Sequence, residues 1–156
     1  MSVLTAEARL KELGIELPQP PQPLGAYVGA VQTGNLLFLS GTLPVDAGKA
    51  KYVGRVGAGL TLEEGAAATR LAALHSLALA RKHLGSLDKV TKVVRLSVAL
   101  VATPDFQAHP RVADGASELL VSIFGRERIS TRAVLGVSSL PLGACVETEI
   151  VFEVQR

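Results

Sequence analysis

The segment 61–84 constrains the fold most, because it carries the signals of a long helix at both of its ends. Thr61 and Glu64 stand at the spacing of a capping box, in which each side chain satisfies a backbone N–H group of the first turn. Gly85 follows the segment and is typical of a helix end. Apolar and small residues recur at intervals of three and four, and many of them are alanine. We therefore expect a helix over 61–84 that packs closely on a sheet.

The other segments predict the order β-β-α-β-α-β-β after a non-regular arm. Four prolines between positions 18 and 23 prevent regular hydrogen bonding there, and Gly34-Asn35 between two apolar runs indicates a hairpin. The expected elements besides 61–84 are a short helix over 5–13, strands over 27–33 and 36–40, a Gly-rich loop over 44–59, a strand over 90–102, a helix over 110–124, and strands over 131–137 and 145–154 joined across 138–144. This order predicts an α+β domain with two helices on one face of a mixed sheet.

The last predicted strand indicates what the uncovered face of this sheet does. One face of the strand is suited to helix packing and consists of Val146, Thr148, Ile150, Phe152 and Val154. The other face mixes acids with smaller residues and consists of Cys145, Glu147, Glu149, Val151 and Glu153. This mixture suits neither solvent nor a core. A subunit interface that carries a polar site would account for it.

Length and composition exclude several classes of protein. The 156 residues predict a single domain over 1–156, in which 1–23 form an N-terminal helix and a Pro-rich arm. No apolar run approaches the roughly 18 residues of a membrane span, and the single cysteine excludes an internal disulfide. No basic region followed by an apolar stretch comes after Met1, so we expect no signal peptide and a cytoplasmic protein. Scattered basic residues, a net charge of +2 and 4% aromatics make nucleic acid a poor partner.

Arg132 and Glu147 are the side chains whose chemistry best suits a small acidic ligand. Arg132 begins a predicted strand, and a guanidinium can grip a carboxylate through two parallel hydrogen bonds. Glu147 lies on the strand expected to run antiparallel beside it and has the chemistry of a general base. The alternatives are a solvated arginine at a strand end and a surface carboxylate. As neighbours, the two strands would bring both side chains within reach of one ligand.

The remaining reactive side chains predict no second site. His75, His83 and His109 lack the spacing of metal ligands, so we expect no metal. Cys145 has no histidine near it in the sequence and is expected to be an interior or interface thiol.

Four segments carry motifs in a fixed order. They are Pro-Leu-Gly-Ala-Tyr27-Val, then Ser40-Gly41-Thr42-Leu43-Pro44-Val45, then Asp105-Phe106, and finally Arg132-Ala133-Val134 with Leu140-Pro141 and Val146-Glu147-Thr148-Glu149. Together they resemble the RidA (YjgF) family, whose members also carry the name endoribonuclease L-PSP. The last segment resembles the family signature R-x-x…L-P-x-x-A-x-V-E-x-E. The resemblance covers about residues 24–154.

This resemblance implies a chorismate-mutase-like fold and a homotrimer with three clefts between subunits. Family members hydrolyse reactive enamines and imines, which implies deamination of small 2-imino or 2-enamino acids to 2-keto acids and ammonia. By resemblance, Arg132 would bind the substrate carboxylate, Glu147 would hold the attacking water and Tyr27 would close over the substrate. The backbones of Gly41 and Val134 would add hydrogen bonds. Neither a metal nor an organic cofactor is implied.

Three positions expected at the substrate-binding part of the cleft depart from the family pattern. Val134 stands where a cysteine is frequent, Thr42 replaces the usual glutamine, and Asp114 falls where the family has an asparagine on its second helix. Asp114 would add negative charge near an anionic substrate. These departures favour an alternative in which the protein binds a small 2-keto acid as a regulator without turnover. A third possibility, an endoribonuclease, lacks a histidine pair for acid–base chemistry on a phosphodiester.

Overall fold

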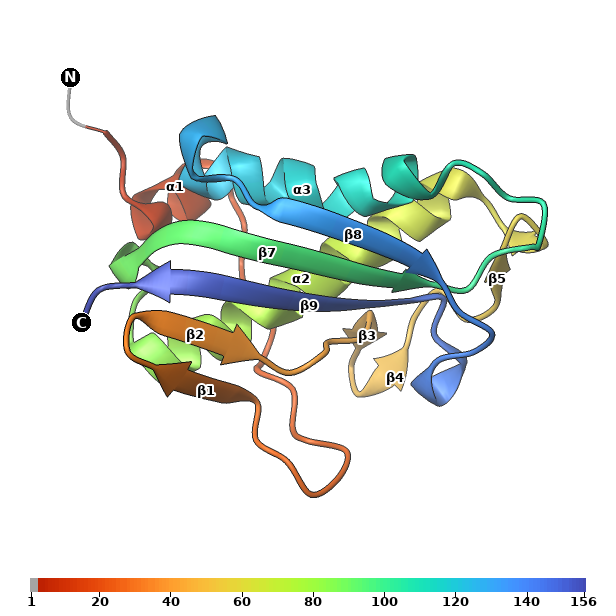
Figure 1. Ribbon diagram of the computed structural model, residues 1–156, viewed down its shortest axis with the longest axis horizontal. Coiled ribbons are helices and arrows are strands. Elements are labelled where there is room, and N and C mark those ends of the chain that lie inside the picture. The colour runs from red at the N-terminus through yellow and green to blue at the C-terminus, as the bar shows by residue number, and fades with distance from the viewer. Residues whose placement is uncertain (1–2) are drawn as a thin grey trace.

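The computed structural model describes residues 3–156, which form a five-stranded mixed sheet backed by helices (Figure 1). The strand order is β1-β2-β9-β7-β8. The five strands are β1 (Ala30–Thr33), β2 (Leu36–Leu39), β7 (Val90–Leu100), β8 (Thr131–Gly136) and β9 (Val146–Val154). Helices α2 (Leu62–Leu84) and α3 (His109–Phe124) lie behind the sheet in Figure 1. The predicted α+β class and the order β-β-α-β-α-β-β are confirmed.

Short elements occupy the N-terminus and the connections. Helix α1 (Ala6–Glu12) opens the chain, and three single turns, η1 (Leu87–Lys89), η2 (Arg126–Arg128) and η3 (Pro141–Gly143), precede β7, β8 and β9 respectively. The predicted Gly-rich loop and the residues just after it contain the two-residue strands β3 (Val45–Asp46), β4 (Lys49–Ala50), β5 (Arg55–Val56) and β6 (Gly59–Leu60).

Helix α2 begins and ends where the sequence predicts. The Glu64 carboxylate accepts a 2.7 Å hydrogen bond from the Thr61 N–H, and Thr61 Oγ1 accepts one of 3.1 Å from the Glu64 N–H. Gly85 ends the helix in the left-handed conformation, with φ of 83°. Helices α2 and α3 approach so closely at Gly115 that a Cβ atom there would collide with the backbone of Ala66. Small residues therefore allow both helices to lie in one layer.

The last two strands follow each other across 138–144 but are not neighbours in the sheet, so the prediction that Arg132 and Glu147 lie on adjacent strands is wrong. Strand β7 lies between them and pairs with β8 in parallel and with β9 antiparallel. Helix α3 is the crossover that a parallel pair requires, and it carries the chain from β7 to β8. Leu96 of β7 is paired with Arg132, whereas Ala99 is paired with Glu147. Arg132 and Glu147 therefore lie on different rows of the sheet, two strands apart.

The core lies between the sheet and the helices. The alternate residues of β9 from Val146 to Val154 are all buried, as predicted, and Phe152 packs on Phe124 of α3 with ring centroids 5.8 Å apart. The opposite face of the sheet is uncovered in the single chain. Large apolar side chains stay exposed there, among them Val31, Phe38 and Leu135.

The N-terminal segment docks at one end of the helical layer and then crosses to the other side of the molecule. The Glu7 carboxylate accepts hydrogen bonds from Arg81 Nη2 at 2.7 Å and from the Leu87 N–H at 2.9 Å. Residues 15–29 contain neither helix nor strand and end in a loop that projects below β1 in Figure 1. No helix of the described residues is long and apolar enough to cross a membrane.

Candidate active site

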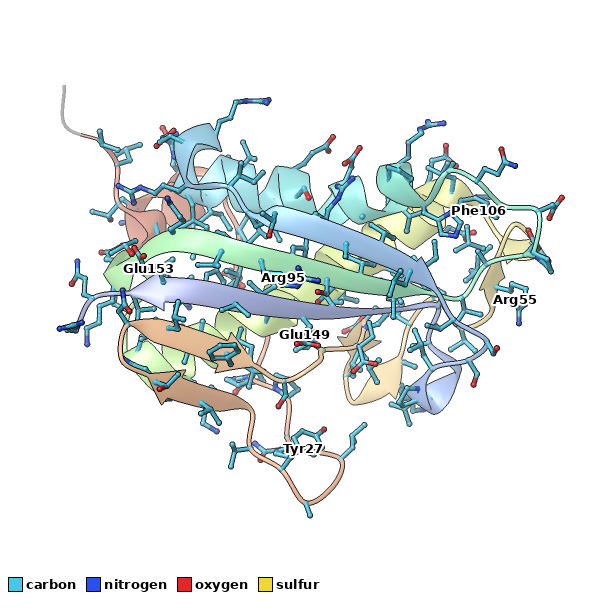
Figure 2. All side chains as sticks on the ribbon, viewed as in Figure 1. Tyr27, Arg55, Arg95, Phe106, Glu149 and Glu153 are labelled. Carbon is cyan, nitrogen blue, oxygen red and sulfur yellow. The ribbon has the colours of Figure 1, made fainter. Side chains whose placement is uncertain are left out.

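A cavity of about 1000 Å³ opens where β2 ends beside β9, and it collects several of the predicted site residues. Tyr27 from the arm, Gly41 after β2 and Glu147 from β9 all line it. Figure 2 shows Tyr27 on the projecting loop, with Glu149 above it on the uncovered face of the sheet. Sequence segments more than a hundred residues apart thus contribute to one hollow.

The carboxylate of Glu147 rests against Gly41. A Cβ atom on Gly41 would lie 2.8 Å from Glu147 Cδ and 3.1 Å from Cγ, so only glycine leaves room for this side chain. Burial raises the pKa of Glu147 above its ordinary value, and the negative charge of Glu149 raises it further. A carboxylate with a raised pKa holds a proton more firmly, which suits a general base.

Three buried hydroxyl groups fix the backbone beside Gly41 and Glu147. Thr42 and Thr148 exchange two backbone hydrogen bonds of 2.8 and 2.9 Å, and their hydroxyl oxygens lie 2.9 Å apart. Thr42 Oγ1 is also 2.7 Å from Ser76 Oγ and donates to the carbonyl oxygen of Ala72 at 2.8 Å. The Thr42 side chain is thus engaged with α2 in the interior. A contact between Thr42 and a ligand stays a prediction.

Tyr27 stands at the rim of the cavity. Its side chain is about half exposed, and its Oη accepts a 3.0 Å hydrogen bond from the Leu24 N–H. The Tyr27 N–H in turn donates to the carbonyl oxygen of Gly25 at 2.9 Å. These two bonds close the bend at the end of the arm. They hold the phenol ring where it can cover a ligand near Glu147.

Arg132 points to the opposite side of the sheet. Because it is level with the fully buried Leu96, its side chain extends toward α3. Nη1 donates to Asp114 Oδ1 at 2.7 Å and to Ser117 Oγ at 3.1 Å, and Nη2 donates to the carbonyl oxygen of Pro110 at 3.3 Å. A quarter of the Arg132 side chain remains exposed. The guanidinium is therefore held by α3 but still accessible.

Within one chain the predicted site is divided into two halves. The cavity half contains Tyr27, Gly41 and Glu147. The arginine half contains Arg132, Asp114 and Val134; Val134 lies on the edge strand β8 with its side chain packed on the core. The expectation that one chain brings Arg132 and Glu147 to the same ligand is wrong, because they lie on opposite faces of the sheet.

Comparison with known proteins decides the family. The model of the family described as YjgF/chorismate-mutase-like endoribonuclease matches residues 7–153. The chain belongs to this family. The resemblance to RidA (YjgF) proteins drawn from the four motifs is thereby confirmed.

Three relatives show how far the YjgF-family likeness extends. Protein TCP17 of Trypanosoma cruzi is 40% identical over 150 residues, which are 96% of this chain and 94% of that protein. A crystal structure from Shewanella oneidensis, described as an endoribonuclease, is 34% identical with a TM-score of 0.93 and covers 97% of this chain and 100% of its own. The 2-iminobutanoate/2-iminopropanoate deaminase of Dermatophagoides farinae is 29% identical over 142 residues, or 90% of this chain and 95% of that protein.

The other reactive side chains of this YjgF-family chain have structural partners or are buried. Burial raises the pKa of the Cys145 thiol to about 11, so the thiol is protonated at neutral pH. His75 Nε2 lies 2.7 Å from the carbonyl oxygen of Val45, and His83 Nε2 lies 3.1 Å from Gln32 Oε1. Within residues 3–156, no group of three or more His, Cys, Asp or Glu side chains is arranged to hold a metal ion.

Two features of the cavity half escaped the sequence patterns. One is the hydroxyl cluster, because Ser76 and Thr148 look like ordinary small residues on a helix and a strand. The other is an apolar wall to which Leu24, Leu79 and Leu142 contribute. The only sequence signal for this wall is the Pro-rich arm, and the sequence does not show that the arm lies beside α2 at this cavity.

Proposed function

We propose that the protein hydrolyses small 2-imino and 2-enamino acids to 2-keto acids and ammonia, in clefts between the subunits of a homotrimer. The observation that carries this proposal is the division of the site. A base beside Gly41 lies on one face of the chain, and an arginine suited to a carboxylate lies on the other. The name of the Dermatophagoides farinae relative supports the same chemistry.

Glu147 is the base in this proposal. Its carboxylate accepts a proton from a water molecule while the water oxygen bonds to C2 of the iminium, and the C=N electron pair moves to nitrogen. The resulting carbinolamine nitrogen then takes that proton back from Glu147. Ammonia leaves as the C2 hydroxyl becomes a carbonyl and releases its own proton. An enamine enters the same sequence after C3 gains a proton. Positioned proton transfer of this kind contributes roughly 10²–10⁴-fold.

Arg132 is the carboxylate ligand in this proposal. The Asp114 carboxylate and Ser117 hydroxyl occupy Nη1, so the exposed part of the guanidinium is what a substrate carboxylate meets. The edge strand β8 offers the backbone of Val134 next to it. Across the cleft, the backbone of Gly41 and the Tyr27 phenol would complete the enclosure. Orienting an electrophilic C2 against a held water supplies much of the rate.

The uncovered face of the sheet supports assembly from copies of the chain. Val31, Phe38 and Leu135 expose about half or more of their surface on this face, which is large for a monomer. A copy that covers this face with its own β8 edge would bring its Arg132 toward Glu147. Repeated around a threefold axis, such a head-to-tail contact closes a ring with three equal clefts.

The test is imine hydrolysis by the purified protein. An amino-acid oxidase generates 2-iminopropanoate or 2-iminobutanoate in situ, and semicarbazide traps the imine that remains. We expect faster loss of trappable imine with the wild type, and little acceleration with Arg132→Ala or Glu147→Gln. Arg128→Ala and Glu153→Gln are matched controls, since Arg128 lies in the exposed turn η2 and the Glu153 carboxylate is occupied by the Thr91 hydroxyl at 2.6 Å.

Two other outcomes would replace the proposal. Saturable binding of a 2-keto acid without acceleration of imine hydrolysis would make the protein a binding or regulatory member of the family. Cleavage of RNA that Arg132→Ala abolishes would favour the endoribonuclease name that the family carries.

A further inference from the structure

The cavity at Glu147 is far larger than a three-carbon imino acid requires. 2-Iminopropanoate has six non-hydrogen atoms and, at no more than about 30 Å³ for each, takes up roughly 180 Å³. In the single chain the cavity measures about 1000 Å³, so even if the copy proposed to cover this face filled about half of it, the remainder would be more than twice that volume. Because Glu147 and Gly41 line this same cavity, the surplus space is continuous with the proposed reaction centre.

Much of the lining apart from the two carboxylates is apolar. The arm contributes Pro23 and Leu24, helix α2 contributes Leu79, and η3 contributes Pro141 and Leu142. Leu24 and Leu142 are 66% and 54% exposed. Leu142 also has φ of 60° and ψ of 14°, a conformation that leucine rarely adopts. The chain thus presents two large, exposed apolar side chains to the hollow that they line.

The wall is built before any ligand arrives. Prolines at 18, 20, 21 and 23 restrict the arm, and the Leu24 N–H is bonded to Tyr27 Oη. The arm then meets α2 so closely that a Cβ atom on Gly29 would lie 2.9 Å from Leu79 Cδ2. A preformed apolar surface binds an apolar group at a low cost in chain ordering.

The charges of the cavity indicate which part of a substrate enters it. Glu147 and Glu149 are the charged carboxylates of its lining, and neither lysine nor arginine is among the described lining residues. A substrate carboxylate is therefore directed away from this cavity, toward an arginine. With C2 beside Glu147, the side chain of the imino acid would lie in the cavity that Leu24 and Leu79 also line.

We infer that this cavity selects 2-imino acids with a branched or aromatic apolar side chain over those with three or four carbons. The inference rests on the proposed imine hydrolysis and names its substrate class. Selection of this kind is measured as the ratio of the kcat/KM values for two substrates. Added carbons in an apolar pocket are worth about tenfold or more.

The experiment compares imines made in situ by D-amino-acid oxidase from D-alanine, D-leucine and D-phenylalanine. C2 of each imine is trigonal, so the configuration of the amino acid does not matter. We expect kcat/KM to be roughly tenfold or more higher for the leucine- and phenylalanine-derived imines than for 2-iminopropanoate. Equal values, or a preference for 2-iminopropanoate, would overturn the inference and leave imine hydrolysis intact. Acceleration of none of the three by the folded protein would overturn the proposed function and the inference with it.

A variant tests the arm directly. Leu24→Ser removes an exposed leucine from the wall, and we expect it to lower the leucine-to-alanine ratio of kcat/KM about threefold or more. Leu13→Ser is the matched control, because Leu13 is 46% exposed at the end of α1 and outside the cavity. An unchanged ratio in Leu24→Ser would refute the role of the arm, and an equal fall in Leu13→Ser would show that the effect is not local.

Discussion

If each proposed cleft takes its arginine from one subunit and its glutamate from another, two inactive variants will restore activity when their subunits are mixed. The variants are Arg132→Ala and Glu147→Gln. Removing the charged partner of a bidentate contact lowers kcat/KM by roughly 100-fold or more, and removing a general base has an effect of at least about that size. Each variant alone should therefore have almost no imine-hydrolysing activity compared with the wild type.

The structure gives the reason that one chain does not form the site alone. Glu147 is level with Ala99, and Ala99 is level with Leu135, which is three residues beyond Arg132 on β8. Three residues along a strand and two steps between strands separate the two Cα atoms by about 14 Å. The side chains also point to opposite faces, so the separation of their charged groups is larger still.

The magnitude of the rescue follows from counting clefts. In a random one-to-one mixture, a cleft is intact when its arginine comes from a Glu147→Gln subunit and its glutamate from an Arg132→Ala subunit. This happens in about a quarter of all clefts in a random mixture of closed rings, and in one cleft of the three in a trimer that contains both variants, which purification through both tags selects. Co-expressed subunits with different tags, purified through both, would be assayed by imine trapping, and sedimentation would give the number of subunits. Activity no greater than the average of the pure variants, in proven mixed assemblies, would refute the shared cleft.

Three further predictions follow from the contacts of the two halves. Gly41→Ala should lower kcat for imine hydrolysis roughly 10- to 100-fold, because its Cβ atom displaces the Glu147 side chain; an unchanged kcat would contradict this packing. Asp114→Asn should lower KM for an imino acid about two- to fivefold with kcat unchanged, because Asp114 competes for Arg132 at 2.7 Å; steady-state kinetics that show a higher KM would oppose it. The pKa of Glu147 is higher in the folded protein than in the unfolded chain. The folded protein therefore gains its full stability from the protonated carboxyl group below the unfolded pKa, and loses this gain as the pH rises through the folded pKa. Glu147→Gln should therefore leave the melting temperature at pH 7 unchanged or raise it by at most about 2 °C, as calorimetry from pH 4 to pH 8 would show, and a clear fall at pH 7 would contradict the assignment.

The sequence predicted those parts of the fold whose determinants are local. The capping box at Thr61 and Glu64 and the stop at Gly85 act within one or two turns, and the structure places the ends of α2 there. The alternation along β9 reports burial directly, because a strand changes face at every residue. The order of the strands has no such local signal. The sequence favours a central strand over 90–102 but does not say which strands lie beside it, and sequence neighbours such as β8 and β9 need not be sheet neighbours.

The position of β7 between β8 and β9 determines how Arg132 and Glu147 are placed relative to each other. Two neighbouring strands would have placed Arg132 and Glu147 in a site within one chain, with no need for assembly. Because β7 lies between β8 and β9, the pairing with β7 determines which face of the sheet each side chain is on. Arg132 is paired with Leu96, and Glu147 is paired with Ala99. Leu96 and Ala99 are an odd number of residues apart on one strand, so the two side chains point to opposite faces. With this register, the arginine and the base of the proposed reaction meet only across a contact with another copy of the chain.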